Sequence, residues 1–288
     1  QLHMDFVIVN KKSIRGMVAL LVVIDARTRK LFAFPTRSRR PPLDTCCFLF
    51  TWLQRQDRAP LAIRVNKDGA LAKSTEFNAF WFDLGVGVFD TGGHASYLNG
   101  KVKRTNHTIM DMVCSQLRTH SADDKFWCFA SQHAPDNGYN IVTHATTGKI
   151  PNAEWFDRTP SIANTRVFFS DVYPIDPHRK KLDPRVLHGK FLCFAATTRL
   201  IKYLDTVTNQ IKETANAYFD EHTTRDQSGN LTPGSLLLRG VSPSLPLPPF
   251  ELTTVDTPIM DRPIHNVAIT LPTLPNKIGL HIGFDNEF

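Results

Sequence analysis

Four clusters of basic side chains are the residues of this chain whose type and spacing most directly suggest a chemistry. They are Lys11, Lys12 and Arg15; Arg37, Arg39 and Arg40; Lys101, Lys103 and Arg104; and Arg179, Lys180 and Lys181. The chain of 288 residues has a formal net charge of +7, and such a surplus of cations favours the binding of nucleic-acid phosphates. We therefore expect a nucleic acid as a partner. The alternative for each cluster is a solvated turn or helix face.

Cysteine and histidine side chains show no metal-binding pattern. The cysteines are Cys46, Cys47, Cys114, Cys128 and Cys193, an odd number with no Cys-x-x-Cys pair. This spacing argues against a zinc ribbon and against a disulfide framework. We expect reduced, mostly buried thiols in an intracellular protein of the nucleus or cytoplasm. The eleven histidines are scattered without metal-ligand spacing and are expected to be ordinary surface or core residues.

The distribution of apolar residues indicates a soluble globular protein. Hydrophobic residues make up 42% of the chain and are mixed with charged ones along most of its length. The longest apolar run, Met17–Ile24, is shorter than the ~20 residues that a membrane-spanning helix needs. We expect no membrane partner. The length suffices for one large domain or two smaller ones, and Gln1 at the start leads us to expect a longer parent protein.

Elements that could position the basic clusters are predicted from periodicity. Three closely spaced apolar runs, Phe6–Val9, Met17–Ile24 and Lys30–Pro35, predict an antiparallel meander. Two strands are expected next, at Ala62–Val65 and Val86–Phe89, and a helix precedes each of them: one has Leu43, Cys46, Cys47, Phe50 and Leu53 on one face, and the other is capped by Ser74 and runs through Phe77, Phe80 and Trp81. A third helix is expected from Lys101 to about His120, with Val102, Ile109, Val113 and Leu117 on one face. A last helical segment, Lys125–Ala134, is expected to end at Pro135. This order predicts an α/β fold, a mixed sheet with helices on both faces.

The character of the sequence changes after Pro160. Four short strands without a long helix between them are expected at Arg166–Phe169, Gly189–Ala196, Ile201–Leu204 and Ile211–Ala215, and they suggest a small antiparallel barrel. From Arg225 onward Ser, Pro, Thr and Gly dominate. That composition predicts a linker or disordered tail.

Six segments then carry a specific resemblance. They are HMDF (3–6), RVNKDGALAKS (64–74), TGGHASYLNGKVKRTN (91–106), KFWCFASQHA (125–134), IPNAEWFDRTPSI (150–162) and, together, KKLDPRVLHGKFLCF (180–194) with YFDE (218–221). In this order they resemble the integrase core and the following retroviral-polymerase SH3-like domain of copia-type LTR retrotransposons. The resemblance covers about Met4 to Glu221. Each segment alone is a weak signal, and their common order makes the set specific.

The resemblance implies a fold and three regions. Residues 1–160 would be a ribonuclease-H-like catalytic core, a five-stranded mixed sheet of order 3-2-1-4-5 with Asp5 on the central strand. Residues 161–224 would be an SH3-like β-barrel, and residues 225–288 a Pro/Ser/Thr-rich linker or tail. The chain lacks the upstream histidine/cysteine zinc module of complete integrases, so we expect a fragment or a truncated copy.

The resemblance also implies a reaction, DNA strand transfer. A DNA 3′-hydroxyl attacks a phosphodiester with the help of two divalent cations, Mg²⁺ or Mn²⁺, which three acidic side chains hold. Asp5 corresponds to the first acid. The second acid corresponds to Asn66, because the residues on both sides of Asn66 match the family motif better. Asp68 is the alternative, because a shift of two residues keeps a side chain on the same face of a strand. Asp5 and Asp68 are the metal ligands that would then remain.

The third acidic position falls on Lys103. An ammonium group cannot bind a metal ion, and it repels one by about 4 kcal/mol per unit charge at ~4 Å and an effective dielectric near 20. We therefore expect an impaired catalytic triad, a degenerate copy, and doubtful metal binding. Lys103 on a DNA-facing helix could instead contact phosphate. Pro135, within an otherwise matching helix, is a further sign of decay.

Three hypotheses follow for function. The chain is an inactive integrase-family copy, or a working integrase that uses Asp5, Asp68 and a substitute acid, or a repurposed nucleic-acid-binding module without catalysis. Lys103 separates the first from the second. The residues expected to bind DNA are Asn99, Lys101, Arg104, Arg39, Arg40, Lys180 and Lys181. The partners implied are retroelement ends, target DNA and, by family, further copies of the chain in a homo-oligomer.

Overall fold

The computed structural model describes residues 1–67, 69–91, 100–163, 165–175, 181–182, 186–195, 200–221, 223–225 and 231–233. All of them belong to one compact unit, Gln1–Gly234. Asp68, Asn99 and Lys180 lie outside the described residues, as does nearly all of the expected tail. None of the helices in the described part of the chain is long and apolar enough to cross a membrane.

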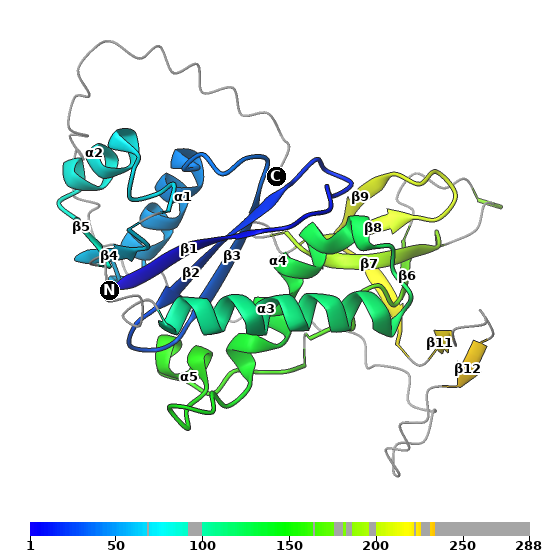
Figure 1. Ribbon diagram of the computed structural model, residues 1–288. Helices are drawn as coiled ribbons and strands as arrows, with labels where there is room; N and C mark the ends of the chain where they lie inside the picture. Colours follow the sequence, from blue (N-terminus) through cyan, green and yellow to red (C-terminus); the bar gives the residue numbers. More distant parts are fainter. Residues whose placement is uncertain are drawn as a thin grey trace, which may run out of the picture. The chain divides into compact units, whose positions relative to one another are not determined.

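A five-stranded mixed sheet forms the first part of the fold (Figure 1). Its strands are β1 (Leu2–Ile8), β2 (Ala19–Asp25), β3 (Leu31–Thr36), β4 (Ala62–Val65) and β5 (Gly87–Asp90). The spatial order is β3-β2-β1-β4-β5, with β1 antiparallel to β2 and parallel to β4. The predicted order and the place of Asp5 on the central strand are therefore confirmed. Every residue of β2 is buried, as expected for an apolar strand that is covered on both faces.

Helices cover both faces of this sheet. The helices are α1 (Leu43–Gln54), α2 (Thr75–Asp83), α3 (Gly100–Thr119), α4 (Trp127–Asn137) and α5 (Pro151–Phe156), and two 3-10 turns occupy Asp124–Phe126 and Tyr139–Ile141. Alternate residues of β2 face opposite ways: Leu21 and Val23 pack with α1 and α2, whereas Leu20 and Val22 pack with α3 and α4. The two faces thus have separate apolar clusters.

Local sequence signals explain several helix features. The buried residues of α3 are Val102, Thr105, Ile109, Val113 and Leu117, and this spacing confirms the predicted apolar face. Ser74 caps α2 by accepting a hydrogen bond of 3.2 Å from the Phe77 N–H, as predicted. In α1, Cys46 and Leu53 are buried as expected, but Cys47 is exposed and Leu49 is buried instead.

Pro135 does not end α4, contrary to expectation. The helix begins at Trp127, continues through the buried Pro135 and ends at Asn137. A proline lacks only its own N–H, and just two helical residues follow it, so few intrahelical bonds remain to be lost. The Gly138 N–H donates to the Ala134 carbonyl and closes the helix.

A second, antiparallel sheet follows. Its strands are β6 (Asp171–Pro174), β7 (Gly189–Phe194), β8 (Ile201–Asp205), β9 (Ile211–Thr214) and β10 (Ala217–Asp220), in the order β10-β6-β7-β8-β9. Within the described ranges β9 and β10 do not pair, so the expected closed barrel is not found there.

Two expectations about the second part are wrong. Residues Arg166–Phe169 are not a strand: Phe168 and Phe169 are buried aromatics in a turn, Phe169 has a φ of 62°, and the first strand starts at Asp171. The segment after Arg225 was expected to lack regular structure, but β12 (Leu231–Pro233) pairs with β11 (Thr223–Arg225). Phe168 and Phe169 have side chains that favour strands, but they fill the core from a turn, because their burial outweighs their strand preference.

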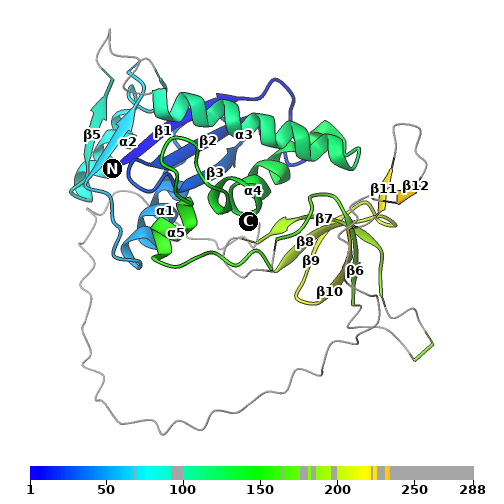
Figure 2. The ribbon, with the colours of Figure 1, turned by 90° about the horizontal axis from the view of Figure 1, so that it is seen from below.

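Helix α4 joins the two sheets (Figure 2). The His133 ring lies 5.7 Å from the ring of Phe191 on β7 and 5.6 Å from that of Phe168. Burial lowers the pKa of His133 to about 4, against the opposing effect of the Arg166 carbonyl. Leu192 and Cys193 belong to the same buried cluster as α3 and α4. The second sheet therefore shares its core with the first.

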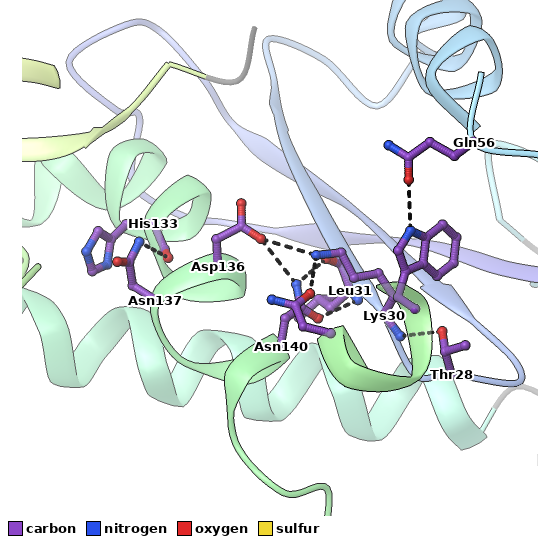
Figure 3. Close-up of polar contacts among 10 residues, drawn as sticks. Thr28, Lys30, Leu31, Gln56, His133, Asp136, Asn137 and Asn140 are labelled. Carbon is purple, nitrogen blue, oxygen red and sulfur yellow. Dashed lines mark hydrogen bonds and ion pairs between the residues drawn. The ribbon is translucent and has the colours of Figure 1, made fainter. Parts of the chain in front are cut away.

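Polar side chains of α4, of the 3-10 turn Tyr139–Ile141 and of α5 form hydrogen bonds with Lys30 and Leu31 at the start of β3 (Figure 3). The Asn140 amide donates to the Leu31 carbonyl at 2.9 Å and accepts from the Leu31 N–H at 2.8 Å, as a neighbouring strand would. Lys30, with a side chain only 6% exposed, donates to Asn152 at 2.6 Å and to Asp136 at 3.4 Å. Burial lowers the pKa of Lys30, and Asp136 opposes this effect.

Candidate nucleic-acid and metal site around Asp5

Asp5 lies in the middle of the central strand and faces α3. Leu2 and Met4 pack with α1 and α2, so the alternate residues of β1 point to the opposite side. There the Asp5 Oδ1 accepts a hydrogen bond of 2.9 Å from the Phe6 N–H, and Oδ2 accepts one of 3.1 Å from the Asn106 amide of α3. Burial raises the pKa of Asp5, and the Phe6 N–H, Asn106 and the charge of Lys103 oppose that rise.

Asn66 is the next residue across the sheet from Asp5. Strand β4 runs parallel to β1, with Met4 opposite Val65, and Asn66 directly follows Val65. A small open cavity of about 180 Å³ is lined by Asp5, Asn66 and Arg39, together with Phe6, Ile8, Gly69, Ala70 and Leu71. The register thus places Asn66 beside Asp5. Asp68, the alternative for the second position, lies outside the described residues, so the assignment of the second position stays a prediction.

Lys103 lies in the first turn of α3, three residues before Asn106 and hence on the same side of the helix. It is exposed and, within the described part of the chain, forms no ion pair. Its charge nevertheless acts on Asp5, since it is one of the influences that lower the pKa of that carboxyl group. Lys103 therefore lies on the side of α3 that faces Asp5, and Asn66 lies beside Asp5 after the adjacent strand β4.

The donor atoms at these three positions do not suit a pair of Mg²⁺ or Mn²⁺ ions. Such ions need several carboxylate oxygens. Asp5 supplies one carboxylate, and both of its oxygens already accept hydrogen bonds. Asn66 supplies a neutral amide, and Lys103 supplies a cation that repels metal. The described residues contain no group of three or more His, Cys, Asp or Glu side chains that could hold a metal ion.

The remaining residues predicted to bind DNA lie in three places. Arg39 lines the cavity, and Arg40 is exposed beside it in the segment between β3 and α1. Lys101 and Arg104 are exposed in the first turns of α3, where the Arg104 Nε donates to the Gly100 carbonyl at 3.4 Å. Lys181 is exposed between β6 and β7. The structure thus gathers Arg39, Lys103 and Asp5 and leaves Lys181 with the second sheet.

Asn106 is a site residue that our sequence reasoning did not single out. It lies in the segment that resembles Glu-Arg-x-Asn, where it takes the place of the asparagine. That segment was the available signal. Its amide nitrogen donates a hydrogen bond to Asp5, while its Oδ1 is buried and has no hydrogen-bond partner in the described part of the chain.

Comparison with known proteins agrees with the resemblance. A family model described as the retroviral polymerase SH3-like domain matches residues 170–233, the part that contains β6 to β12. The Retrovirus-related Pol polyprotein from transposon TNT 1-94 of Nicotiana tabacum is 22% identical over 216 residues, 74% of this chain. The chain spans 16% of the length of that relative. Both matches fit the integrase region of a copia-type retrotransposon.

Proposed function

We propose that this chain is an integrase-core-like, DNA-binding part of a retrotransposon polyprotein, with a ribonuclease-H-like first sheet and an SH3-like second sheet. The observation that carries the proposal is the meeting of Asp5 on the central strand with Asn106 of α3 and with Asn66 after the adjacent parallel strand. The resemblance implies that Asp5 lies near the second position and near the start of α3, although these residues are far apart in the sequence. Its partners would be retroelement ends and target DNA, with further copies of the chain in a homo-oligomer, in the nucleus or cytoplasm.

DNA binding would depend on phosphate contacts from the basic side chains around the site. Arg39 borders the cavity, and Lys101, Lys103 and Arg104 are exposed at the start of α3. Contacts of this kind hold a phosphate backbone without reading its bases. Lys103 thus has a use that requires no metal.

Catalysis is the part of the family function that the site supports least. A metal pair would supply the charge that stabilises the attacking and leaving oxygens during strand transfer. The side chains at positions 5, 66 and 103 do not fit such a pair, so the proposal includes no strand-transfer step. Because these side chains do not fit a metal pair, they favour the second candidate function, a nucleic-acid-binding module that is derived from an integrase and has no catalytic activity.

The test is the salt dependence of DNA binding, measured by fluorescence anisotropy on two duplexes of unrelated sequence. We expect similar affinities for both duplexes, and a log affinity that falls with log salt by about 0.9 per phosphate contacted. An Arg39→Gln/Lys103→Gln variant should lower both the affinity and this slope. The matched control, Arg55→Gln/Arg118→Gln, removes two exposed arginines away from the cavity. Affinity that is equal at low and moderate salt contradicts the proposal.

A further inference from the structure

Two arginines on the α3 side of the sheet have no role in the site described above. Arg64 is on β4, opposite His3 of β1. Its neighbours Ile63 and Val65 pack with α1 and α2, so Arg64 points toward α3. Arg29 lies in the turn between β2 and β3 with a φ of 64°. That left-handed conformation is unfavourable for a long side chain and is more often taken by Gly, Asn or Asp.

Lys101 lies in the first turn of α3, and this helix packs on β1, which pairs with the strand of Arg64, and on β2, which leads into the turn of Arg29. Partial burial and then the charges of Arg29 and Arg64 lower the pKa of Lys101, while Asp25 acts in the opposite direction. The three cations therefore repel one another.

The carboxylate that acts on Lys101, that of Asp25, already accepts hydrogen bonds from the turn that holds Arg29. The Asp25 Oδ2 accepts hydrogen bonds from the Arg27 N–H at 3.2 Å, from the Thr28 N–H at 2.7 Å and from the Thr28 hydroxyl at 2.8 Å. Among the described residues, none of the three cations forms an ion pair. Within the described ranges, the Nε atoms of Arg29 and Arg64 are buried and have no hydrogen-bond partner.

Buried donors without partners and clustered cations without counter-charge both raise the free energy of a fold. One anion between these side chains would relieve both. A guanidinium group offers two parallel N–H donors whose geometry matches two oxygens of a phosphate. A phosphate therefore fits the chemistry of the cluster.

We propose that Arg29, Arg64 and Lys101 form a binding site for one backbone phosphate of DNA. The proposal rests on the DNA-binding function proposed above and adds an anchor to it. Arg64 precedes Asn66 by two strand residues, a distance of about 6–7 Å along β4. DNA held by this anchor would pass along the α3 face toward the cavity at Asp5.

The first experiment compares two charge-matched double variants in the intact chain. Arg29→Gln/Arg64→Gln removes two cluster charges, and Arg55→Gln/Arg118→Gln removes two exposed charges elsewhere. We expect the cluster variant alone to bind duplex DNA more weakly, with a salt slope smaller by about 0.9, the value for one phosphate. A cluster variant that binds DNA as the control does, with an unchanged slope, overturns the proposal.

A second variant guards against loss of folding. Arg29→Asn suits the left-handed backbone and relieves charge repulsion, so its melting temperature should equal or exceed that of the unmodified chain while its DNA affinity falls. Unchanged DNA affinity in this folded variant counts against the site.

A third measurement separates failure of the site from failure of the proposed function. Inorganic phosphate, compared with chloride at equal ionic strength, should raise the melting temperature of the unmodified chain more than that of Arg29→Gln/Arg64→Gln. This result without any DNA binding would keep the phosphate site and overturn its assignment to DNA. Equal shifts in both proteins and no DNA binding would overturn both.

Discussion

The surroundings of Asp5 disfavour the negative charge that its carboxyl group would need to bind a metal ion. Burial raises its pKa above the ordinary value of 3.8, and the hydrogen bonds and Lys103 offset only part of that rise. A carboxyl group whose pKa is higher in the folded than in the unfolded protein binds more protons when folded. It therefore destabilises the fold once the pH exceeds both pKa values.

The Asp5→Asn variant should accordingly be more stable than the unmodified chain at pH 7. The amide oxygen of the new Asn side chain can still accept a hydrogen bond from the Phe6 N–H. If the Asn106 amide flips, its Oδ1, which has no partner among the described residues of the unmodified chain, can accept from the new NH₂ group. Urea unfolding should show that the difference closes as the pH falls from above the raised pKa toward 3.8. A difference that widens on acidification would show that the carboxylate is favoured in the folded protein.

Single residues also show which parts of a candidate site a sequence can suggest. Asp5, Asn66 and Lys103 could be chosen because they lie in segments with a recognisable order. Arg29 and Arg64 could not, because only the strand order and the β2–β3 turn bring positions 29, 64 and 101 together. A charge cluster made by topology leaves no local pattern in the sequence.

At the scale of elements, the buried contact between Asn140 and strand β3 has a measurable consequence (Figure 3). Asn140→Ala leaves the Leu31 N–H and carbonyl without their side-chain partner in a buried setting. The cost should be roughly 2–6 kcal/mol of unfolding free energy, because two buried groups lose their partner and each unsatisfied group costs about 1–3 kcal/mol.

The control for this prediction is Asn10→Ala, at an exposed turn residue, which should change the free energy by less than about 0.5 kcal/mol. Chemical denaturation of both variants gives the comparison. An Asn140→Ala protein as stable as the control would mean that water replaces the amide at no cost.

Elements with a strong period were predictable, and those shaped by tertiary packing were not. The apolar face of α3 follows from a spacing of three to four residues, and the cap of α2 follows from Ser74. In contrast, Phe168 and Phe169 have strand-like propensity, yet they fill the core beside α4, where Phe169 contacts Phe126 at 5.2 Å between ring centres.

At the scale of the whole molecule, the two sheets of the described unit depend on a common core. Leu192, Cys193 and Leu204 of the second sheet belong to the buried cluster that α3 and α4 form against the first. The helix that carries Lys103 and Asn106, α3, therefore shares a buried apolar cluster with residues 170–233, which match the SH3-like family model. This sharing was not apparent from sequence, which suggested a separate small barrel.

We propose that the chain keeps the integrase arrangement without the ligands for a metal pair. Calorimetric titration of the unmodified chain with Mn²⁺ tests it most directly, beside the Asn66→Asp/Lys103→Glu variant and Lys103→Glu alone. We expect no two-ion binding at micromolar affinity by the unmodified chain, and recovered binding by the double variant. Lys103→Glu alone should recover binding only if Asp68 already serves as the second acid. Two-ion micromolar binding by the unmodified chain would contradict the account and show that position 103 is not the third acidic position.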